Sequence, residues 1–406
     1  MQKYLSRIAE KKFLRMNESF PIVLVTGARQ IGKTTMLEHL AKGQQRTCVT
    51  LDDLNARDLA LNDAARFFQN YKTPIIIDEI QYAPSLFSQI KLMCDRNKRA
   101  GEFWLTGSQS YNLIKNVSES LAGRVGIVEM SSFTMDEYFD AINESLHVFE
   151  IDDIKTRFEK CRKYSIDELF EFIYRGGMPK AFGFSEEAHK DYLNTYIRTY
   201  LMRDVMELGK ISDTVKFNRF LIACAAMISS QLNVATLANA ADISQPTAKE
   251  WLNVLQGLGI VYLLQPYFNN EIKRLVKSPK LYFYDTGLAA YLSLWPSSQT
   301  LKVGNMSGAY FENFCMNQII KKLPNQVNIF YYRDTDQKEV DIVLESHAGL
   351  TPIEIKQTSN PHEGDTAKFK VLDKLKRKIL PGAIICTIDK PLLVEGDNVF
   401  LPVVVL

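Results

Sequence analysis

The pattern of apolar and polar residues changes character twice along the chain. Up to about residue 140, short apolar runs typical of buried strands alternate with segments of helical periodicity. This alternation predicts a parallel sheet with helices on both faces. We expect helices over residues 1–20, 33–40 and 84–99, and strands over 22–25, 47–51, 75–78, 103–106 and 125–130.

From residue 151 the pattern is mainly helical, and from about residue 305 it is again a mixture of helices and strands. A Gly-Gly-Met-Pro run at 176–179 indicates a turn between helices. Breaks in the pattern near 140–150, 210 and 295–305 are the candidate domain boundaries. The chain is therefore expected to hold several domains in succession.

The composition sets limits on this interpretation. With 406 residues, the chain is long enough for roughly two to four domains. Its 49 Lys and Arg residues nearly balance 47 Asp and Glu residues, which excludes a wholly basic chain but allows a local basic face. The 6 Cys residues lack the close spacing of a zinc site, and no apolar run approaches the ~20 residues of a membrane span. We expect a cytoplasmic protein without a membrane segment or a signal peptide.

The first motif with a chemical meaning follows the first predicted strand. Residues 27–34 fit G-x-x-x-x-G-K-[ST] at every fixed position, between an apolar strand and a helix. Backbone N–H groups of such a loop bind phosphate, and its glycines avoid a Cβ that would block the loop. We expect Lys33 to act in catalysis on the β- and γ-phosphates of ATP, and Thr34 to bind Mg²⁺. The expected nucleotide-binding residues of the loop are Gly27, Ala28, Arg29, Gln30, Ile31, Gly32, Lys33, Thr34 and Thr35.

Two carboxylates, Asp78 and Glu79, end the next fully apolar strand. In a phosphoryl-transfer site, Asp78 would orient Mg²⁺ and Glu79 would polarise the attacking water. Ser108 and Gln109 end a further strand, where they either hydrogen-bond the γ-phosphate or simply form a turn. Arg124 is a candidate for stabilising charge on the γ-phosphate of its own or a neighbouring subunit, and the alternative is an ordinary surface arginine.

The order of these and later motifs resembles a prokaryotic family that couples an AAA-type ATPase module to a C-terminal domain of unknown function. The resemblance covers nearly the whole chain, and it implies ATP binding and hydrolysis by a P-loop ATPase. It rests on the segments GARQIGKTT (27–35), PIIIDEIQ (74–81), FWLTGSQ (103–109), SLAGRV (120–125), RGGMPKAF (175–182) and YDTGLAAYL (284–292).

Residues 211–295 have the layout of a winged helix-turn-helix. Three predicted helices, over 217–228, 234–240 and 244–258, precede two strands that would form the wing. We expect the third helix to contact the major groove of DNA and the basic wing to contact phosphates. The alternative is a scaffold that packs on the ATPase, with its charges merely solvated. The candidate DNA-binding residues are Lys249, Lys273, Arg274 and Lys277, and Lys280 lies in the same basic run.

The last segment, 300–406, resembles a restriction-endonuclease-like core. A predicted helix with Glu312 precedes a strand edge with Asp341 and a strand that carries Glu354 and Lys356. Because side chains alternate along a strand, Glu354 and Lys356 point to one face, where Asp341 can converge. Asp341 and Glu354 would hold Mg²⁺, Glu312 would orient a ligand water, and Lys356 would polarise the attacking water. The pattern is short and also occurs by chance, and such domains also serve as inactive binding modules.

These interpretations combine into one leading hypothesis and two alternatives. We expect a mixed α/β chain that binds and hydrolyses Mg-ATP and is coupled to DNA through its later domains. The alternatives are an ATP-controlled switch that acts through a protein partner, and an ATP-gated, Mg²⁺-dependent nuclease. Arg124 would serve a neighbouring site only in a homo-oligomer. The predicted domains are a P-loop ATPase domain at 1–150, a helical lid at 151–210, a winged helix-turn-helix at 211–295 and a restriction-endonuclease-like domain at 300–406.

Overall fold

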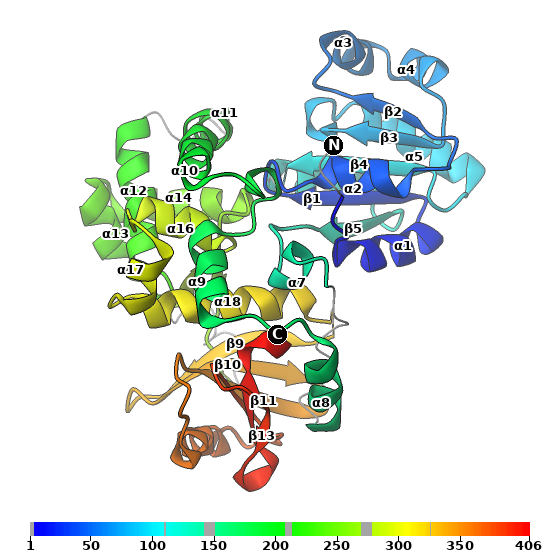
Figure 1. Ribbon diagram of the computed structural model, residues 1–406. Coiled ribbons are helices and arrows are strands. Elements are labelled where there is room, and N and C mark those ends of the chain that lie inside the picture. The colour runs from blue at the N-terminus through cyan, green and yellow to red at the C-terminus, as the bar shows by residue number, and fades with distance from the viewer. Residues whose placement is uncertain (1–3, 109–110, 142–150, 208–212, 269–277, 325) are drawn as a thin grey trace. The chain divides into compact units, whose positions relative to one another are not determined.

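The computed structural model forms two compact units, both visible in Figure 1. The residues that it describes are 4–108, 111–141, 151–207, 213–268, 278–324 and 326–406. Unit 1 comprises Met1–Phe133, Met178–Phe182 and Gly257–Ile260, and unit 2 comprises Thr134–Gly177, Gly183–Gln256 and Val261–Leu406. The chain thus passes between the units several times, and the predicted domain limits remain predictions.

A five-stranded parallel sheet forms the centre of unit 1 (blue and cyan in Figure 1). Its strands lie in the order β2-β3-β4-β1-β5, so the strand that precedes the glycine-rich loop has neighbours on both sides. The strands are β1 (Ile22–Gly27), β2 (Thr47–Thr50), β3 (Ile75–Asp78), β4 (Phe103–Ser108) and β5 (Val125–Glu129). The predicted parallel α/β sheet is therefore confirmed.

Helices cover both faces of this sheet. Ile22 and Leu24 of β1 belong to a buried cluster with residues of α3, α4, α5 and α6. On the other face Trp104 of β4 packs against Phe13 of α1, with ring centroids 4.8 Å apart. This burial on both faces explains the uninterrupted apolar runs of the strands. The helices are α1 (Ala9–Ser19), α2 (Lys33–Leu40), α3 (Leu54–Asn62), α4 (Ala64–Asn70), η1 (Ile80–Tyr82), α5 (Leu86–Asn97), α6 (Tyr111–Ser120) and η2 (Pro179–Ala181).

The first part of unit 2 is mainly helical, as the sequence predicts. Its helices are α7 (Met135–Tyr138), α8 (Ile151–Lys160), α9 (Ile166–Arg175), α10 (Glu186–Thr195), η3 (Tyr196–Leu201), α11 (Met202–Glu207), α12 (Thr214–Ala226), α13 (Val234–Ala241), α14 (Gln245–Gly257), α16 (Thr286–Leu292) and α17 (Ser298–Val303). A small antiparallel sheet has the order β6-β8-β7, with β6 (Ser230–Gln231), β7 (Val261–Leu264) and β8 (Lys280–Phe283).

Aromatic packing and a helix cap explain the local structure around α14. Trp251 of α14 meets Phe217 and Phe220 of α12, with ring centroids 5.3 and 5.5 Å away. Ser244, which precedes α14, accepts a hydrogen bond from the backbone N–H of Thr247 through its Oγ at 3.2 Å and so caps the helix. The elements from α12 to β8 therefore follow the order and approximate limits that the sequence predicts.

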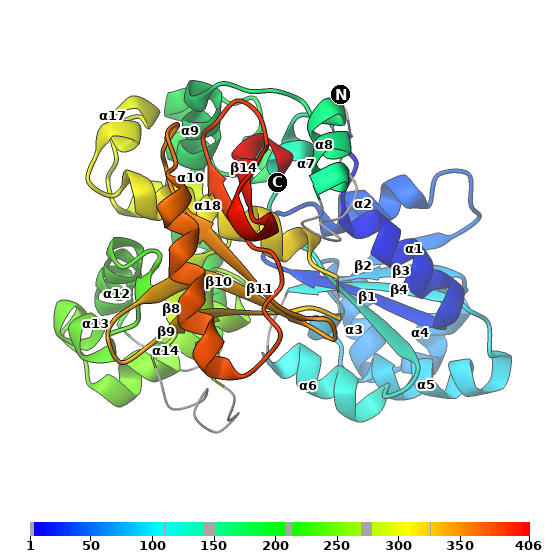
Figure 2. The ribbon, with the colours of Figure 1, turned by 90° about the horizontal axis from the view of Figure 1, so that it is seen from below.

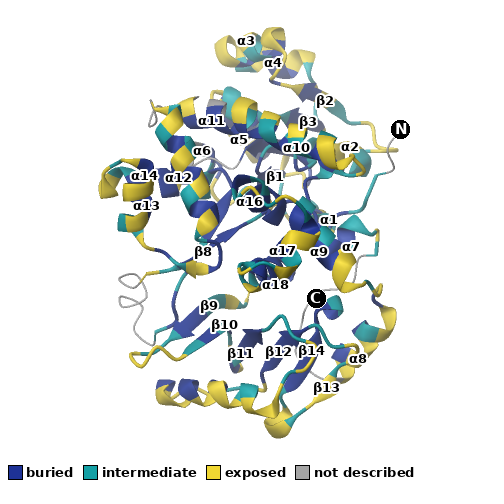
Figure 3. Cartoon of the chain, turned by 60° about the vertical axis from the view of Figure 1, so that its left-hand side comes forward, coloured by how far each residue is buried: buried dark blue, intermediate teal, exposed yellow. Residues whose placement is uncertain are grey.

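A six-stranded mixed sheet forms the last part of unit 2, in the order β13-β14-β12-β11-β10-β9. The long 3₁₀ helix η4 crosses one face in Figure 2, where its Phe369 and Leu372 join Val340 and Val343 of β10 in a buried cluster. Strands β11, β12 and β14 are largely buried (Figure 3), whereas both residues of β13 are exposed. The elements are α18 (Ser307–Lys322), β9 (Asn328–Arg333), β10 (Glu339–Ser346), β11 (Gly349–Ile355), η4 (Glu363–Leu375), β12 (Ala383–Cys386), β13 (Leu392–Leu393), η5 (Glu395–Asp397), β14 (Val399–Pro402) and η6 (Val403–Val405).

Two glycine motifs that lie far apart in the sequence meet in unit 2. The backbone N–H of Gly177 donates to Asp285 Oδ2 at 2.9 Å, across 108 sequence positions. Gly176 has φ of 75°, and a Cβ there would lie 2.1 Å from Asp285 Oδ1. A Cβ at Gly287 would lie 2.1 Å from the carbonyl oxygen of Arg175. The RGG and DTG segments therefore interlock at a distance that only glycine permits.

The six cysteines are free thiols. Across the described part of the chain, the helices are too short or too polar for any of them to span a membrane.

Candidate functional site

The glycine-rich loop lies between β1 and α2, at the carboxyl edge of the five-stranded sheet. Gln30 and Gly32 adopt left-handed conformations, with φ of 61° and 88°. Lys33 begins α2, and only 5% of it is exposed. Its ammonium donates to the carbonyl oxygens of Gly27 and Ala28 at 3.1 and 2.9 Å. The ammonium thus lies within the loop, where phosphate oxygens could accept its hydrogen bonds in place of these carbonyl oxygens.

Asp78 ends β3 and accepts hydrogen bonds from three threonine hydroxyls. Thr34 and Thr106 both donate to Oδ1 at 2.5 Å, and Thr50 donates to Oδ2 at 3.1 Å. Hydroxyl and carboxylate oxygens are the ligands that Mg²⁺ prefers. Thr34 and Asp78, which lie in direct contact, therefore fit the expected Mg²⁺ ion. Thr50 and Thr106 were not expected, because their position beside Asp78 follows from the strand order.

Glu79 has an unusual backbone conformation at the same edge. Its φ of 57° and ψ of 48° lie in the left-handed region, which costs a non-glycine residue about 1 kcal/mol. Its N–H donates to the hydroxyl of Thr106 at 3.1 Å, and its carboxylate accepts from the amide of Gln81. These contacts fix the Glu79 backbone beside Thr106 and its carboxylate beside Gln81, at the strand end where the sequence predicts the group that polarises water.

The other predicted nucleotide-binding residues do not all lie at the loop surface that would face the phosphates. Ser108 is opposite Gly27 in the pairing of β4 with β1, and it is buried beside the loop. Thr35 is exposed on α2, whereas Arg29 donates to the hydroxyl of the η1 tyrosine at 3.0 Å. Gln109 lies outside the described residues. The buried loop residues Ala28 and Ile31 complete the predicted set.

Arg124 is at the other edge of the sheet. Its carbonyl oxygen accepts the N–H of Ile22, the first residue of β1, and its Nε contacts Asp95 Oδ1 at 2.6 Å. The glycine-rich loop begins five residues further along β1, roughly 17 Å away at the rise of a strand. Arg124 therefore does not lie at the phosphate-binding edge of its own sheet, contrary to the expectation for its own subunit. A role in a neighbouring subunit stays a prediction.

Arg7, in the N-terminal segment, supports the loop and was not predicted from the sequence. It is 5% exposed, and its guanidinium donates to the carbonyl oxygens of Ile31 at 2.7 Å and Ser131 at 2.6 Å. It also lies over the ring of Phe133, 4.6 Å from the centroid. Arg7 therefore ties the loop to the chain that follows β5. No local motif distinguishes this arginine from a surface one.

A second group of charged residues lies in unit 2, around Lys280 of β8. Its ammonium is 3.1 Å from Glu312 of α18, and 2.5 and 3.3 Å from Glu339 and Asp341 of β10. The hydroxyl of Tyr282, two residues further along β8, donates to Glu312 at 2.6 Å. Two of the four predicted nuclease residues thus meet at a lysine. Lys280 was expected to be a wing residue, but it is only 3% exposed and is directed into the domain.

The other two predicted nuclease residues have lysine and aspartate partners of their own. Glu354 of β11 is 2.6 Å from the ammonium of Lys368, and its Oε2 is buried without a hydrogen-bond partner among the described residues. Lys356 pairs with Asp365 of η4 rather than facing a free space. The backbone N–H of Ile355 donates to Asp341 Oδ2 at 3.0 Å, which links β11 to the cluster.

Burial sets the protonation of these carboxyls. Burial, followed by repulsion from Asp341, raises the pKa of Glu312 to about 7 and the pKa of Glu354 to about 7. Burial opposes the charged form of Lys280, but the three carboxylates outweigh it and raise the Lys280 pKa. The lysine therefore keeps its charge throughout the physiological range of pH.

The residues of this cluster do not fit a divalent metal ion. Nowhere in the described ranges do three or more His, Cys, Asp and Glu side chains come together as a metal-binding group. Mg²⁺ and Ca²⁺ require several oxygen ligands about 2.0–2.6 Å from one point. In this domain the Lys280 ammonium lies between Glu312 and Asp341, and we derive no metal-dependent step through these residues.

The predicted DNA-binding residues are only partly described. Lys249 is exposed on α14. Lys273, Arg274 and Lys277 lie outside the described residues. The burial of Lys280 removes it from the set of groups available to DNA phosphates.

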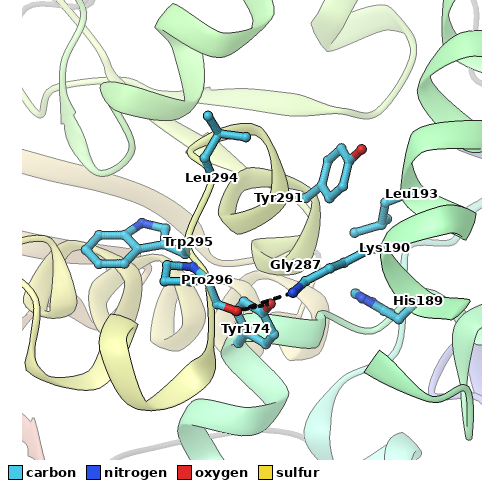
Figure 4. Close-up of a pocket in the computed structure, with 9 residues that line it drawn as sticks. All are labelled: Tyr174, His189, Lys190, Leu193, Gly287, Tyr291, Leu294, Trp295 and Pro296. Atoms are coloured by element: carbon cyan, nitrogen blue, oxygen red, sulfur yellow. Dashed lines mark hydrogen bonds between the residues drawn. The ribbon is translucent and has the colours of Figure 1, made fainter. Parts of the chain in front are cut away.

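A small pocket of about 210 Å³ lies next to the interlocked glycine motifs (Figure 4). Its polar groups bond to the protein: the hydroxyl of Tyr174 and the ammonium of Lys190 both donate to the carbonyl oxygen of Pro296, at 3.1 and 3.3 Å. The Nε2 atom of His189 is 2.7 Å from the carbonyl oxygen of Arg175, and burial lowers the pKa of His189. These bonds join α9, α10 and the segment after α16, so we assign the pocket no ligand.

Comparison with known families agrees with this geometry. Family models match residues 19–139 as an AAA domain, 166–299 as a domain of unknown function (DUF8612) and 307–406 as a domain of unknown function (DUF4143). The sheet order, the glycine-rich loop and the strand-end carboxylates define the class. The protein is an AAA-type ATPase of the P-loop family with a C-terminal DUF4143 domain.

Relatives of known sequence define the family. Uncharacterized proteins of Mycobacterium tuberculosis and Mycobacterium bovis are each 30% identical over 370 residues, which are 90% of this chain and 77% of theirs. An uncharacterized protein of Methanocaldococcus jannaschii is 21% identical over 419 residues, covering 95% of this chain and 84% of its own. The chain belongs to the family of these proteins.

Solved structures give weaker similarities. The Walker-type ATPase of Pyrococcus abyssi has 14% identity and a TM-score of 0.45, over 72% of this chain and 96% of that one. The RuvB Holliday junction branch migration motor of Thermotoga maritima has 18% identity and a TM-score of 0.32, over 67% of this chain and 95% of that one. The class assignment accordingly rests on the family models and the loop geometry.

Proposed function

We propose that the protein binds Mg-ATP at the carboxyl edge of the five-stranded sheet and hydrolyses its γ-phosphate bond. The observation that carries this proposal is the contact between the Thr34 hydroxyl and the Asp78 carboxylate beside the buried Lys33 ammonium. These three groups are a hydroxyl ligand, a carboxylate that orients the metal, and a cation for the β- and γ-phosphates. A bound Mg²⁺ ion would neutralise charge that develops on the phosphates.

Different residues of the chain hold the phosphates and orient the attacking water. The N–H groups of the loop and the N-terminus of α2 hold the phosphates, and Lys33 exchanges its backbone carbonyl partners for phosphate oxygens. Glu79 accepts a hydrogen bond from the attacking water and orients it toward the γ-phosphate. The Thr106 hydroxyl positions both acidic residues, because it donates to Asp78 and accepts from the N–H of Glu79.

The test compares two variants of the full chain in nucleotide-binding and phosphate-release assays. Lys33→Ala should lose ATP binding by roughly 100-fold or more, because it removes a buried cation from the phosphates. Glu79→Gln should bind ATP with nearly unchanged affinity and turn over roughly 100-fold more slowly. Unchanged hydrolysis in the Glu79→Gln protein would contradict the role of Glu79, and unchanged binding in the Lys33→Ala protein would contradict the site.

We further propose that ATP turnover is coupled to DNA through the region from α12 to β8, as a winged helix-turn-helix. In support, α14 follows α13 after a short turn, as a recognition helix does, and its Lys249 is exposed. The basic segment with Lys273, Arg274 and Lys277 lies where the wing is expected in the sequence. The nuclease-like core would act as an additional surface rather than as the catalyst.

Salt-dependent DNA binding tests this coupling. Replacing Lys273, Arg274 and Lys277 together with alanine should weaken binding and reduce the slope of log affinity against log salt by about 3, at roughly 1 per phosphate contact. Lys249→Ala should reduce the slope by about 1. Removal of an equivalent charge in unit 1, in Lys91→Ala on the exposed face of α5, is the matched control. If DNA does not change the ATPase rate, and if these variants bind DNA as the wild type does, the proposed coupling is wrong. The alternative of an ATP-controlled switch with a protein partner is then favoured.

A further inference from the structure

The position of Lys280 has a consequence for the domain that follows it. Lys280 is on β8, outside the six-stranded sheet, yet its ammonium reaches carboxylates of both α18 and β10. An ammonium has three N–H donors, and here three carboxylates lie within 2.5–3.3 Å of it. The number of N–H donors therefore equals the number of carboxylates, and each N–H of the buried ammonium has a carboxylate within reach.

The neighbouring Glu354 is a second observation, independent of the Lys280 ion pairs, that bears on the role of this acidic cluster. Glu354 is only 5% exposed, and its Oε2 lacks a hydrogen-bond partner among the residues that the structure describes. It adjoins Asp341, since the N–H of the following residue, Ile355, donates to Asp341 Oδ2 at 3.0 Å. Four carboxylates, one buried and three partly buried, are thus gathered here, and one of them has an unused oxygen. Such a concentration of acidic groups favours a cation among them.

We propose that Lys280 is a built-in cation that occupies the place of a divalent metal ion in the nuclease-like core. The domain is consequently a metal-independent module that does not cleave DNA. A divalent ion enters between Glu312, Asp341 and Glu354 only when the lysine side chain is removed. This inference is independent of the proposed ATPase function, because it concerns residues of unit 2 alone.

Physical considerations explain why the lysine excludes a metal ion. Ammonium and Mg²⁺ cannot share the same carboxylates at close range, because two positive charges would be forced together in a buried environment. Mg²⁺ also gives up its water reluctantly, whereas the lysine is attached to the chain and keeps a high local concentration. The remaining predicted groups are also engaged, because Lys368 neutralises Glu354 and Lys356 pairs with Asp365.

The experiment measures Mn²⁺ binding to the full chain without nucleotide, by titration and by the shift of the melting temperature. We compare the wild type, Lys280→Ala, and Lys280→Ala combined with Asp341→Asn. Mn²⁺ should raise the melting temperature of Lys280→Ala, leave the wild type nearly unchanged, and lose its effect again in the double variant. Any weak binding at the P-loop is common to all three proteins and cancels. Wild-type protein should also leave supercoiled plasmid intact in Mg²⁺ or Mn²⁺.

Two results would overturn the inference. The first is a wild-type protein that binds Mn²⁺ or cleaves plasmid in a way that Asp341→Asn abolishes. The second is a folded Lys280→Ala protein that acquires no Mn²⁺ site. If Lys280→Ala does not fold even with Mn²⁺ present, the comparison of wild type with Asp341→Asn decides: equal metal binding and no cleavage by either support the inference.

Discussion

Strands β3 and β10 each carry an aspartate at a candidate site, and the partners of these two residues differ in kind. In unit 1 the Asp78 carboxylate accepts hydrogen bonds from the neutral hydroxyls of Thr34, Thr50 and Thr106. In unit 2 the Asp341 carboxylate meets the ammonium of Lys280 at 3.3 Å. A carboxylate with neutral donors keeps its charge available for a metal ion, whereas one with a buried ammonium does not. The partners, rather than the acidic residues themselves, distinguish the two sites.

The largest expected difference between the two sites is in ATP hydrolysis. Asp78→Asn should reduce the rate by roughly 100-fold, about 3 kcal/mol of transition-state stabilisation, because it removes the charge that orients the metal. Asp341→Asn should change the rate less than about 2-fold, since it lies outside the nucleotide site. Phosphate release at saturating Mg-ATP measures both variants. A comparable loss of ATP hydrolysis in both variants would contradict the assignment of Asp78, and not Asp341, to the nucleotide site.

The next difference is in folding stability, and it compares the two buried lysines. Lys280→Ala leaves three carboxylates without their cation and should lower the free energy of unfolding by about 3–5 kcal/mol. Lys33→Ala removes a lysine that donates to two backbone carbonyls and should cost only about 1 kcal/mol. Denaturant unfolding of the nucleotide-free proteins measures both. Equal losses of unfolding free energy in the two variants would mean that the ion pairs of Lys280 stabilise the fold no more than the hydrogen bonds of Lys33 do.

A pH titration of stability sharpens the comparison further. The pKa of Glu354 is about 7 in the folded protein, against an ordinary value of 4.5. The folded protein therefore binds this proton more tightly than the unfolded chain does, and protonation favours folding. This contribution is complete below pH 4.5 and is lost as the pH rises through about 7. The wild-type melting temperature should fall between pH 5 and 8, and Glu354→Gln, which cannot titrate, should flatten that dependence by a few degrees.

The smallest expected effect comes from an exposed lysine that also has carboxylate partners. Lys374 is 3.0 Å from Asp334 and 3.9 Å from Asp336, with 58% of its side chain exposed. Lys374→Ala should leave the free energy of unfolding nearly unchanged, because solvent screens the pair. The same denaturant measurement serves as the control for Lys280→Ala. A large loss here would indicate that burial is not what separates the two lysines.

Local signals made the nucleotide site predictable from the sequence. The limits of α2 and β3 agree with the predictions to the residue, because an apolar run, a glycine-rich turn and a helix start are encoded by neighbouring residues. Contacts that depend on strand order were not predictable. Thr50 and Thr106 reach Asp78 only because β2 and β4 flank β3.

The acidic cluster illustrates the other limit of sequence reasoning. The sequence predicted that Asp341 converges with Glu354 and Lys356 and that Glu312 orients a ligand water, whereas in the structure Glu312 and Asp341 both contact the Lys280 ammonium. It assigned Lys280 to a DNA-binding wing, because a lysine in a basic run has the same local signature whether it is exposed or buried. Its contacts with Glu312 and Asp341 span 32 and 61 sequence positions. Only the tertiary structure shows which charge is paired with which.

The interlocked RGG and DTG segments have a consequence for how this family can change over time. Gly176 and Gly287 leave no space for a Cβ, and Asp285 accepts a hydrogen bond from the backbone N–H of Gly177. A side chain added at Gly176 would collide with Asp285, and one added at Gly287 would collide with Arg175. A second change within the same segment therefore cannot relieve the collision. The two segments should therefore be inherited as a pair: a lineage that loses the aspartate is expected to lose its glycines as well, whereas the loops nearby diverge freely.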